Sequence, residues 1–166
     1  RKVELVHEKD SIGTSFYFKI NDIPIFAKGA NYVPMSPFPS QIDSSKYEKL
    51  IDKVGEANMN MIRVWGGGVY ESDYFYDLCD QNGIMVWQDF MFANSLYYFD
   101  SRFKATASIE AFQNLRRLNS HPSIVLWCGN NEIEVAWNNW GWQKQFGWTK
   151  EQENEIWTAN QHFFEK

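Results

Sequence analysis

The chain has 166 residues, of which 44% are hydrophobic and 17% aromatic, and its formal net charge is −5 at pH 7. This length can bury a core as one domain, and the absence of a basic run disfavours nucleic acid and anionic membranes as partners. No apolar run approaches the ~18 residues that a membrane span requires. The first ten residues, RKVELVHEKD, contain no apolar signal-peptide core, so no targeting segment is visible and the compartment is left open.

The N-terminal third reads as β structure followed by a loop. Residues 2–6 alternate between apolar and polar and predict a strand. Two β-rich runs around Asn21 and Asp22 predict a hairpin, with Pro24 beginning its second strand. The following stretch, NYVPMSPFPS, holds three prolines and is expected to be a loop.

From there the pattern alternates between strands and helices. Ser45 and Glu48 have the spacing of a capping box and predict a helix that ends near Asn58. Two further helices and a helical C-terminal segment are expected between and after apolar strands. We predict those strands at 25–30, 61–65, 84–88 and 124–128.

Strands that are apolar on both faces and joined by helices indicate a parallel sheet in an α/β fold. The pattern fits either an open doubly wound sheet or half of a (β/α)8 TIM barrel. No G-x-G-x-x-G follows the first strand, so the dinucleotide-binding version lacks its signature. The GGG at 66–68 is interpreted as a flexible loop, since no lysine follows to make a phosphate site.

The two cysteines, Cys79 and Cys128, lie in apolar patterns without metal-ligand spacing. We interpret them as buried free thiols in preference to a disulfide.

Polar and aromatic side chains gather where the predicted strands end, which is where active sites of parallel α/β folds lie. A carboxylate, amides, a guanidinium and an indole suit a neutral polyhydroxylated ligand. These residues are Arg63, Trp65, Gln88, Asp89, Asn130, Asn131 and Glu132.

Four tryptophans crowd twelve residues after the last strand, at positions 137, 140, 142 and 148. A packed helix would not usually place them so, which favours a surface that stacks on sugar rings. Packing within a loop is the alternative for three of them, Trp137, Trp142 and Trp148.

Several segments of the sequence resemble a known protein family. SHPSIVLWCGNNE resembles the acid/base strand of glycoside hydrolase family 2, whose members are (β/α)8 barrels. The segments at 16–34 and 61–93 and the tryptophan-rich stretch resemble its β-mannosidase branch, so nearly the whole chain is covered. The resemblance implies that residues 1–10 are the last strand of a preceding β-sandwich domain. Residues 11–166 would then be the N-terminal half of the barrel.

The resemblance also implies roles for five residues. Glu132 would be the general acid/base, and Asn131 would hydrogen-bond the 2-hydroxyl of the sugar. Trp65 and Trp140 would line the −1 subsite, while Arg63 would keep the nucleophile ionised. It implies neither a metal nor a cofactor.

Three further positions have weaker assignments. Asp89 could touch sugar or bond a neighbouring loop, and Asn130 is a weaker substrate-binding candidate. Glu134, two residues beyond Glu132, is the alternative acid.

The implied function is a retaining hydrolase that removes terminal β-D-mannose from the non-reducing ends of glycans, in a periplasmic, secreted or lysosomal parent. Its nucleophile comes from the seventh barrel strand in this family, so the chain is expected to be an inactive fragment that needs the rest of its parent to complete the barrel. The alternatives are a β-galactosidase, a β-glucuronidase or a carbohydrate-binding module. The alternation of strands and helices disfavours the module, because such modules are usually β-sandwiches.

Overall fold

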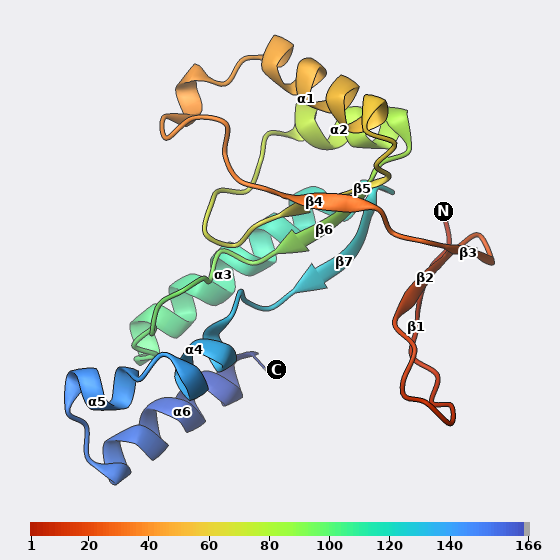
Figure 1. Cartoon of the computed structure of the whole chain (residues 1–166). Coiled ribbons are helices and arrows are strands. Elements are labelled where there is room, and N and C mark those ends of the chain that lie inside the picture. Colours follow the sequence, from red (N-terminus) through yellow and green to blue (C-terminus); the bar gives the residue numbers. More distant parts are fainter. Residues whose placement is uncertain (165–166) are drawn as a thin grey trace.

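The computed structural model describes residues 1–164 and contains two sheets (Figure 1). An antiparallel sheet has the order β1-β2-β3, and a parallel sheet has the order β4-β5-β6-β7. The strands are β1 (Val3–Val6), β2 (Tyr17–Ile20), β3 (Ile23–Ile25), β4 (Gly29–Tyr32), β5 (Met61–Val64), β6 (Met85–Asp89) and β7 (Ile124–Cys128).

The antiparallel sheet contains the predicted hairpin. Asn21 and Asp22 form its turn with φ values of 49° and 67°, the left-handed geometry that two-residue hairpins favour. β2 also pairs with β1 along its other edge. Antiparallel pairing therefore continues to Ile25, well beyond residue 10. A domain boundary at residue 10 stays a prediction.

The second sheet is parallel, as expected, and its four strands are adjacent in chain order. The first of them was placed too early. We expected it at 25–30, but it is β4, Gly29–Tyr32, because residues 23–25 are taken up by the hairpin. The proline-rich loop between β4 and α1 contains one short 3-10 helix, Pro39–Gln41.

Helices α1 (Ser44–Glu56), α2 (Asp73–Asn82) and α3 (Ser101–Leu118) connect these strands, as expected (Figure 1). Side chains alternate between the two faces of a strand. In β5, Ile62 and Val64 therefore face the helices and are buried in the main core. The opposite face carries Met61 and Arg63, and Met61 packs against Phe18 of the antiparallel sheet.

The cap of α1 differs from the expected capping box. Asp43 is its N-cap, and the Oδ1 atom of Asp43 accepts hydrogen bonds from the Lys46 backbone N–H at 3.1 Å and from the Ser45 hydroxyl at 2.8 Å. Ser45 therefore lies inside the helix and supports the cap, because a carboxylate stands two residues before it. α2 ends at Gly83, which adopts φ 69°, the left-handed conformation that glycine favours.

Three helices follow β7: α4 (Ile133–Asn139), α5 (Trp142–Phe146) and α6 (Lys150–Phe164). The predicted C-terminal helix is confirmed by α6. The tryptophan-rich segment was wrongly expected to be non-helical. Trp137 stacks between Trp148 and Trp157, with ring centroids 6.0 and 5.2 Å away, and Trp142 is buried in the same small core.

Among helices of the described residues, none combines the length and the apolar character needed to cross a membrane. Both cysteines are free thiols, as predicted. Cys79 is buried as expected, but Cys128 is only partly buried.

Candidate active site

The carboxyl ends of β5, β6 and β7 are joined by one side chain, that of Arg63. Its Nη2 atom lies 2.8 Å from Oδ2 of Asp89 and its Nε atom lies 3.3 Å from Oδ1. The same Nη2 atom is 2.8 Å from Oδ1 of Asn131, the third residue after β7. Three of the predicted strand-end residues therefore form one hydrogen-bonded cluster.

Asp89 is the buried centre of this cluster. Its side chain is fully buried, and besides Arg63 it accepts hydrogen bonds from the Gly66 backbone N–H at 3.0 Å and from Nε1 of Trp87 at 2.9 Å. The guanidinium of Arg63 also lies 5.0 Å from the centre of the Trp87 ring, a cation–π arrangement. Asp89 was expected either to touch sugar or to bond a neighbouring loop, and the structure shows the bond to the loop, through the Gly66 N–H. Gln88 faces the helices instead, where the Tyr76 hydroxyl donates to it at 2.5 Å.

Asn131 is held on both sides of its amide. Its Oδ1 atom accepts from Arg63, and its Nδ2 atom donates to Oδ1 of Asn94 at 2.9 Å. Its backbone N–H donates to the carbonyl of Phe92 at 2.8 Å. These bonds fix the amide orientation and leave one Nδ2 hydrogen for a ligand.

Asn94 was missed at the sequence level. It lies in the loop after β6 and has φ 50°, a left-handed conformation that asparagine tolerates better than most residues. Its only sequence signal is an amide a few residues beyond a strand end, which is a common pattern.

Glu132 follows Asn131 at the N-cap of α4. It is a non-glycine residue in the left-handed region, with φ 58° and ψ 16°, a conformation that costs about 1–3 kcal/mol and is enriched at functional sites. Its side chain is exposed, and it has no hydrogen-bond or ion-pair partner among residues 1–164. Glu134, the alternative acid, is also exposed but lies in the first turn of α4.

The Asn130 side chain stabilises the backbone at the start of α4. Its Oδ1 atom accepts from the Ile133 backbone N–H at 3.2 Å and so caps the beginning of α4. This bond holds the turn in which Glu132 lies.

The glycine run after β5 is closely packed, contrary to the flexible loop that we expected. A Cβ atom on Gly67 would lie only 2.0–2.4 Å from three carbons of the Trp65 ring, and one on Gly66 would lie 2.5 Å from the Phe90 carbonyl oxygen. Glycine is required here because ring and backbone approach too closely for any side chain. Trp65 is thereby held, half-buried, directly after β5.

Trp140 differs from the other clustered tryptophans, because 46% of it is exposed. It lies at the C-cap of α4 and packs edge-on against Trp142, with ring centroids 5.6 Å apart. Glu132 and Trp140 thus stand at opposite ends of one short helix, about 12 Å apart along its axis.

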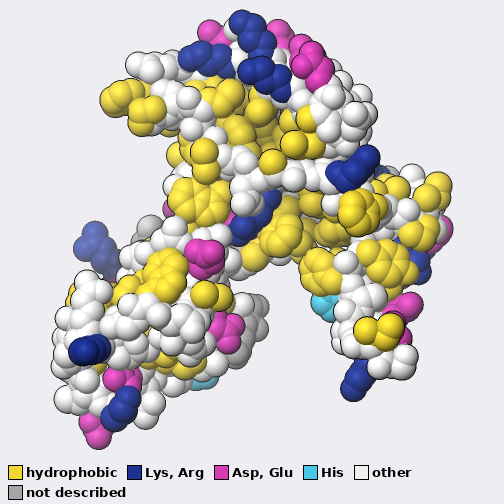
Figure 2. All heavy atoms as spheres, viewed as in Figure 1, with side chains coloured by type: hydrophobic (Ala, Val, Ile, Leu, Met, Phe, Trp, Pro, Cys, Tyr) yellow, Lys and Arg dark blue, Asp and Glu magenta, His cyan; other side chains and the backbone are white. Residues whose placement is uncertain are grey.

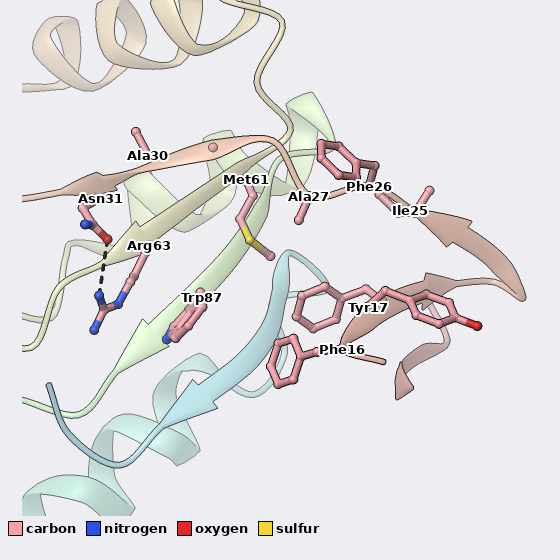
Figure 3. Close-up of a pocket in the computed structure, with 12 residues that line it drawn as sticks. Phe16, Tyr17, Ile25, Phe26, Ala27, Ala30, Asn31, Met61, Arg63 and Trp87 are labelled. Atoms are coloured by element: carbon pink, nitrogen blue, oxygen red, sulfur yellow. Dashed lines mark hydrogen bonds between the residues drawn. The ribbon is translucent and has the colours of Figure 1, made fainter. Parts of the chain in front are cut away.

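A cavity of about 550 Å³ opens on the face of the parallel sheet that carries Arg63 (Figure 3). Arg63, Asn31 and Trp87 form its polar end, where Nη1 of Arg63 lies 3.4 Å from Oδ1 of Asn31. Aromatic side chains such as Phe16 and Phe18 line the other end. Figure 2 shows this side of the molecule as a hollow with hydrophobic and basic side chains along its wall. Its volume is in the range of small-molecule sites.

A separate cluster lies at the opposite ends of the strands. Asp77, Asp80 and His121 have ligand atoms within 4.8 Å of one another. Nδ1 of His121 lies 2.7 Å from Asp80, whose other oxygen accepts from the Ser123 backbone N–H at 2.8 Å. These bonds tie α2 to the start of β7 and account for the cluster.

Comparison with known proteins gives close relatives over most of the chain. No protein-family model matches it. It is 54% identical over 143 residues to the β-mannosidase of Mus musculus, an alignment that covers 84% of this chain and 16% of the mouse protein. The crystal structure of β-D-mannosidase from Dictyoglomus thermophilum superposes with a TM-score of 0.80 at 54% identity, covering 82% of this chain and 17% of that one.

A more distant likeness concerns the fold alone. The structure of Bacteroides uniformis β-glucuronidase 2 covers 98% of this chain with a TM-score of 0.76 at 16% identity. The chain spans about a sixth of the length of the mannosidases that it matches.

Proposed function

Because the chain belongs to the β-mannosidase family, we propose that it is a segment of a retaining glycoside hydrolase of family 2. The full-length enzyme would remove terminal β-D-mannose residues from the non-reducing ends of β-mannosides. The observation that carries the proposal is the 54% identity to a β-D-mannosidase of known structure, over a segment that includes the strand-end cluster. The substrate would be an oligosaccharide or glycan, without a cofactor.

The fold is proposed to be the N-terminal half of a (β/α)8 barrel. Its support is the order of β4 to β7, which are parallel and adjacent in chain order with helices between them. Both outer strands of this sheet leave an edge without a neighbour among the described residues. The rest of the full-length chain would pair with these edges and close the barrel.

Glu132 is proposed to be the general acid/base. A retaining glycosidase needs two carboxyl groups about 5–5.5 Å apart. In the first step Glu132 protonates the glycosidic oxygen while a carboxylate from the remainder of the chain attacks the anomeric carbon. In the second step Glu132 accepts a proton from the water that releases mannose. Its exposure at a strand end and its strained backbone support this role.

Asn131 is proposed to donate its remaining Nδ2 hydrogen to the 2-hydroxyl, which is axial in mannose. This hydrogen bond strengthens as the ring becomes oxocarbenium-like. The bonds from Arg63 and Asn94 hold the amide in place beforehand, so little reorganisation is needed. Arg63 would also lie beside the nucleophile and favour its ionised form.

Trp65 and Trp140 are proposed to form walls of the −1 subsite. An indole covers the apolar face of a sugar ring. Trp65 is held against Gly67, and Trp140 exposes 46% of its surface at the far end of α4.

The test is a comparison of aryl β-D-mannoside, β-D-galactoside and β-D-glucuronide as substrates of the full-length protein that contains this segment. We expect kcat/KM for the mannoside to exceed the values for the other two substrates by at least about 100-fold. Sites that hydrogen-bond substrate hydroxyls discriminate strongly against substrates that cannot make those bonds. Glu132→Gln should lower activity, whereas Glu134→Gln, a matched change two residues away, should not. A preference for galactoside or glucuronide would overturn the proposal that the substrate is a β-mannoside. Carbohydrate binding without hydrolysis would favour a binding module.

A further inference from the structure

The loop from Trp65 to Ser72 joins β5 to α2 and carries a buried carboxylate at its far end. Trp65 begins this loop, and Glu71 stands near its end with only 3% of its surface exposed. The mechanism above uses Trp65 but gives no role to Glu71. A buried carboxylate costs several kcal/mol of desolvation unless hydrogen bonds compensate it, so its presence requires an explanation.

The beginning of the loop is held by backbone hydrogen bonds. The Trp65 N–H donates to the Tyr32 carbonyl at 3.2 Å, and the Gly68 N–H donates to the Trp65 carbonyl at 3.1 Å. Between them, the Gly66 N–H donates to the Asp89 carboxylate at 3.0 Å. Trp65 therefore begins a tight turn attached to both β4 and β6.

The end of the loop is held by two phenols. The Tyr32 hydroxyl donates to Oε1 of Glu71 at 2.9 Å, and the Tyr47 hydroxyl donates to Oε2. Both tyrosines are buried. Tyr32 thus contacts the loop twice, through its carbonyl at the start and through its hydroxyl at the end.

These phenols remain donors at any ordinary pH. Burial, followed by the hydrogen bond to Glu71, raises the pKa of Tyr47 to about 12. Burial and then the charge of Glu71 raise the pKa of Tyr32 well above its usual value. Within residues 1–164 no ion pair involves the Glu71 carboxylate, and Arg117 donates only to its backbone carbonyl, at 3.2 Å.

We propose that Glu71 is a positioning residue of the active site, whose carboxylate, bound by Tyr32 and Tyr47, fixes the β5–α2 loop and thereby the indole of Trp65. The proposal rests on the proposed function only for the role of Trp65. Three contacts made by Tyr32 and Tyr47 set the path of the loop between its ends. Loss of the carboxylate frees the far end of the loop. Gly67, against which the indole packs, is then held less firmly, so the indole shifts relative to the strand ends.

The first experiment measures backbone amide hydrogen exchange over residues 65–70 in the full-length protein. Glu71→Gln should raise the exchange rates of this segment at least 10-fold, and Tyr47→Phe should raise them in the same segment. Tyr74→Phe is the matched control, because it removes an exposed tyrosine–glutamate bond, from Tyr74 to Glu48 at 2.7 Å. Unchanged exchange in Glu71→Gln would overturn the proposal.

The second experiment separates positioning from stability with a double-mutant cycle. Glu71→Gln should lower kcat/KM for an aryl β-mannoside about 10- to 100-fold, the scale of a displaced binding group. In a Trp65→Ala background the same change should cost less than about 2-fold, because the indole that it positions is gone. Tyr74→Phe should leave kcat/KM unchanged. An equal loss in both backgrounds would show a general structural role and overturn the proposal.

The two experiments also distinguish this proposal from the proposed function. If the full-length protein hydrolyses a different glycoside, the cycle is run on that substrate and the mannosidase proposal alone fails. If it hydrolyses none, the active-site role of Glu71 fails with it. Exchange over residues 65–70 still decides whether Glu71 holds the loop.

Discussion

The Nη2 atom of Arg63 lies 2.8 Å from Oδ1 of Asn131, although the two residues are 68 positions apart in the chain. The same nitrogen lies 2.8 Å from the carboxylate of Asp89. One guanidinium therefore connects the ends of three strands and orients the amide next to the proposed acid. The cluster contributes both to the stability of the sheet and to the geometry of the site.

Replacing Arg63 should be costly because it leaves a buried carboxylate without its cation. We expect Arg63→Met to lower the free energy of unfolding by about 3–5 kcal/mol, the cost of breaking a buried ion pair. Asp89→Asn should cost less, because the Arg63 side chain is 21% exposed and water can solvate it. Denaturant unfolding of the full-length protein measures both, with Arg116→Met, an exposed arginine, as control. Equal losses in the Arg63 and Arg116 variants would contradict the interpretation.

Replacing glycine by alanine should be harmful at Gly67, where it lowers activity, and beneficial at Gly55, where it raises stability. In Gly67→Ala the new Cβ would lie 2.0 Å from the Trp65 ring, so the indole must move and kcat/KM should fall. We expect a loss of at least about 10-fold. In Gly55→Ala no atom lies within 4 Å of the new Cβ, so this helical site should gain about 0.5–1 kcal/mol of stability. Steady-state kinetics and thermal unfolding measure the pair, and full activity in Gly67→Ala would refute the packing argument.

Cys79 should make stability fall at alkaline pH. Burial, followed by the charge of Asp80, raises the pKa of its thiol to about 12. An unfolded thiol ionises near pH ~8.5, so between that pH and ~12 only the unfolded state loses a proton and is favoured. Below pH ~8 the group makes no difference. Unfolding followed from pH 7 to 10.5 should show a decline that Cys79→Ala reduces.

The same burial predicts slow labelling of the Cys79 thiol. Iodoacetamide at pH 8 should leave Cys79 unmodified in the native 166-residue chain and should modify both Cys79 and Cys128 in denaturant. Mass spectrometry distinguishes these states. A mass two hydrogens lighter would reveal the disulfide that the structure does not contain.

Local patterns predicted most of the fold, and their failures have local causes. The hairpin turn at Asn21 and Asp22 and the helix end at Gly83 are encoded by residues that tolerate positive φ, which a sequence displays directly. The first parallel strand was misplaced because residues 23–25 pair within the hairpin, and their β propensity does not say with which sheet. The helices α4 and α5 were missed because Trp137 and Trp142 are buried against α6, a contact without sequence periodicity.

The sequence predicted several residues of the candidate site but not the hydrogen bonds between them. Strand-end position picked out Arg63, Asp89 and Asn131, because parallel strands bring their carboxyl ends to one edge. Their pairing depends on separations of 26 and 68 residues, and no spacing rule encodes such contacts. Asn94 and Glu71 were missed for the same reason, since each acquires its role from a partner that is distant in the sequence.

The 166-residue chain alone should hydrolyse aryl β-mannosides at no measurable enzymatic rate. We propose that the second carboxylate lies in the remainder of the full-length chain. Without it no glycosyl-enzyme forms, and protonation of the leaving group alone contributes roughly 10²–10⁴-fold. The edges of β4 and β7, which have no paired neighbour within residues 1–164, would also leave the site loosely held. An assay of the purified chain beside the full-length protein decides this. Comparable rates in the two would show that the nucleophile lies within these residues.

The strongest test of the mechanism is Glu132→Gln in the full-length protein. Substrates with poor leaving groups need protonation, so their turnover should be abolished. Activated aryl β-mannosides depart with little protonation, so the glycosyl-enzyme should form and then accumulate, because its hydrolysis still requires the base. Azide needs no base and should restore turnover, giving β-mannosyl azide. Product analysis by NMR with and without azide, beside Glu134→Gln as control, measures each step. Full activity on an unactivated substrate would show that Glu132 is not the general acid/base. An α-configured mannosyl azide would contradict the retaining mechanism, because two successive inversions at the anomeric carbon must restore the β configuration.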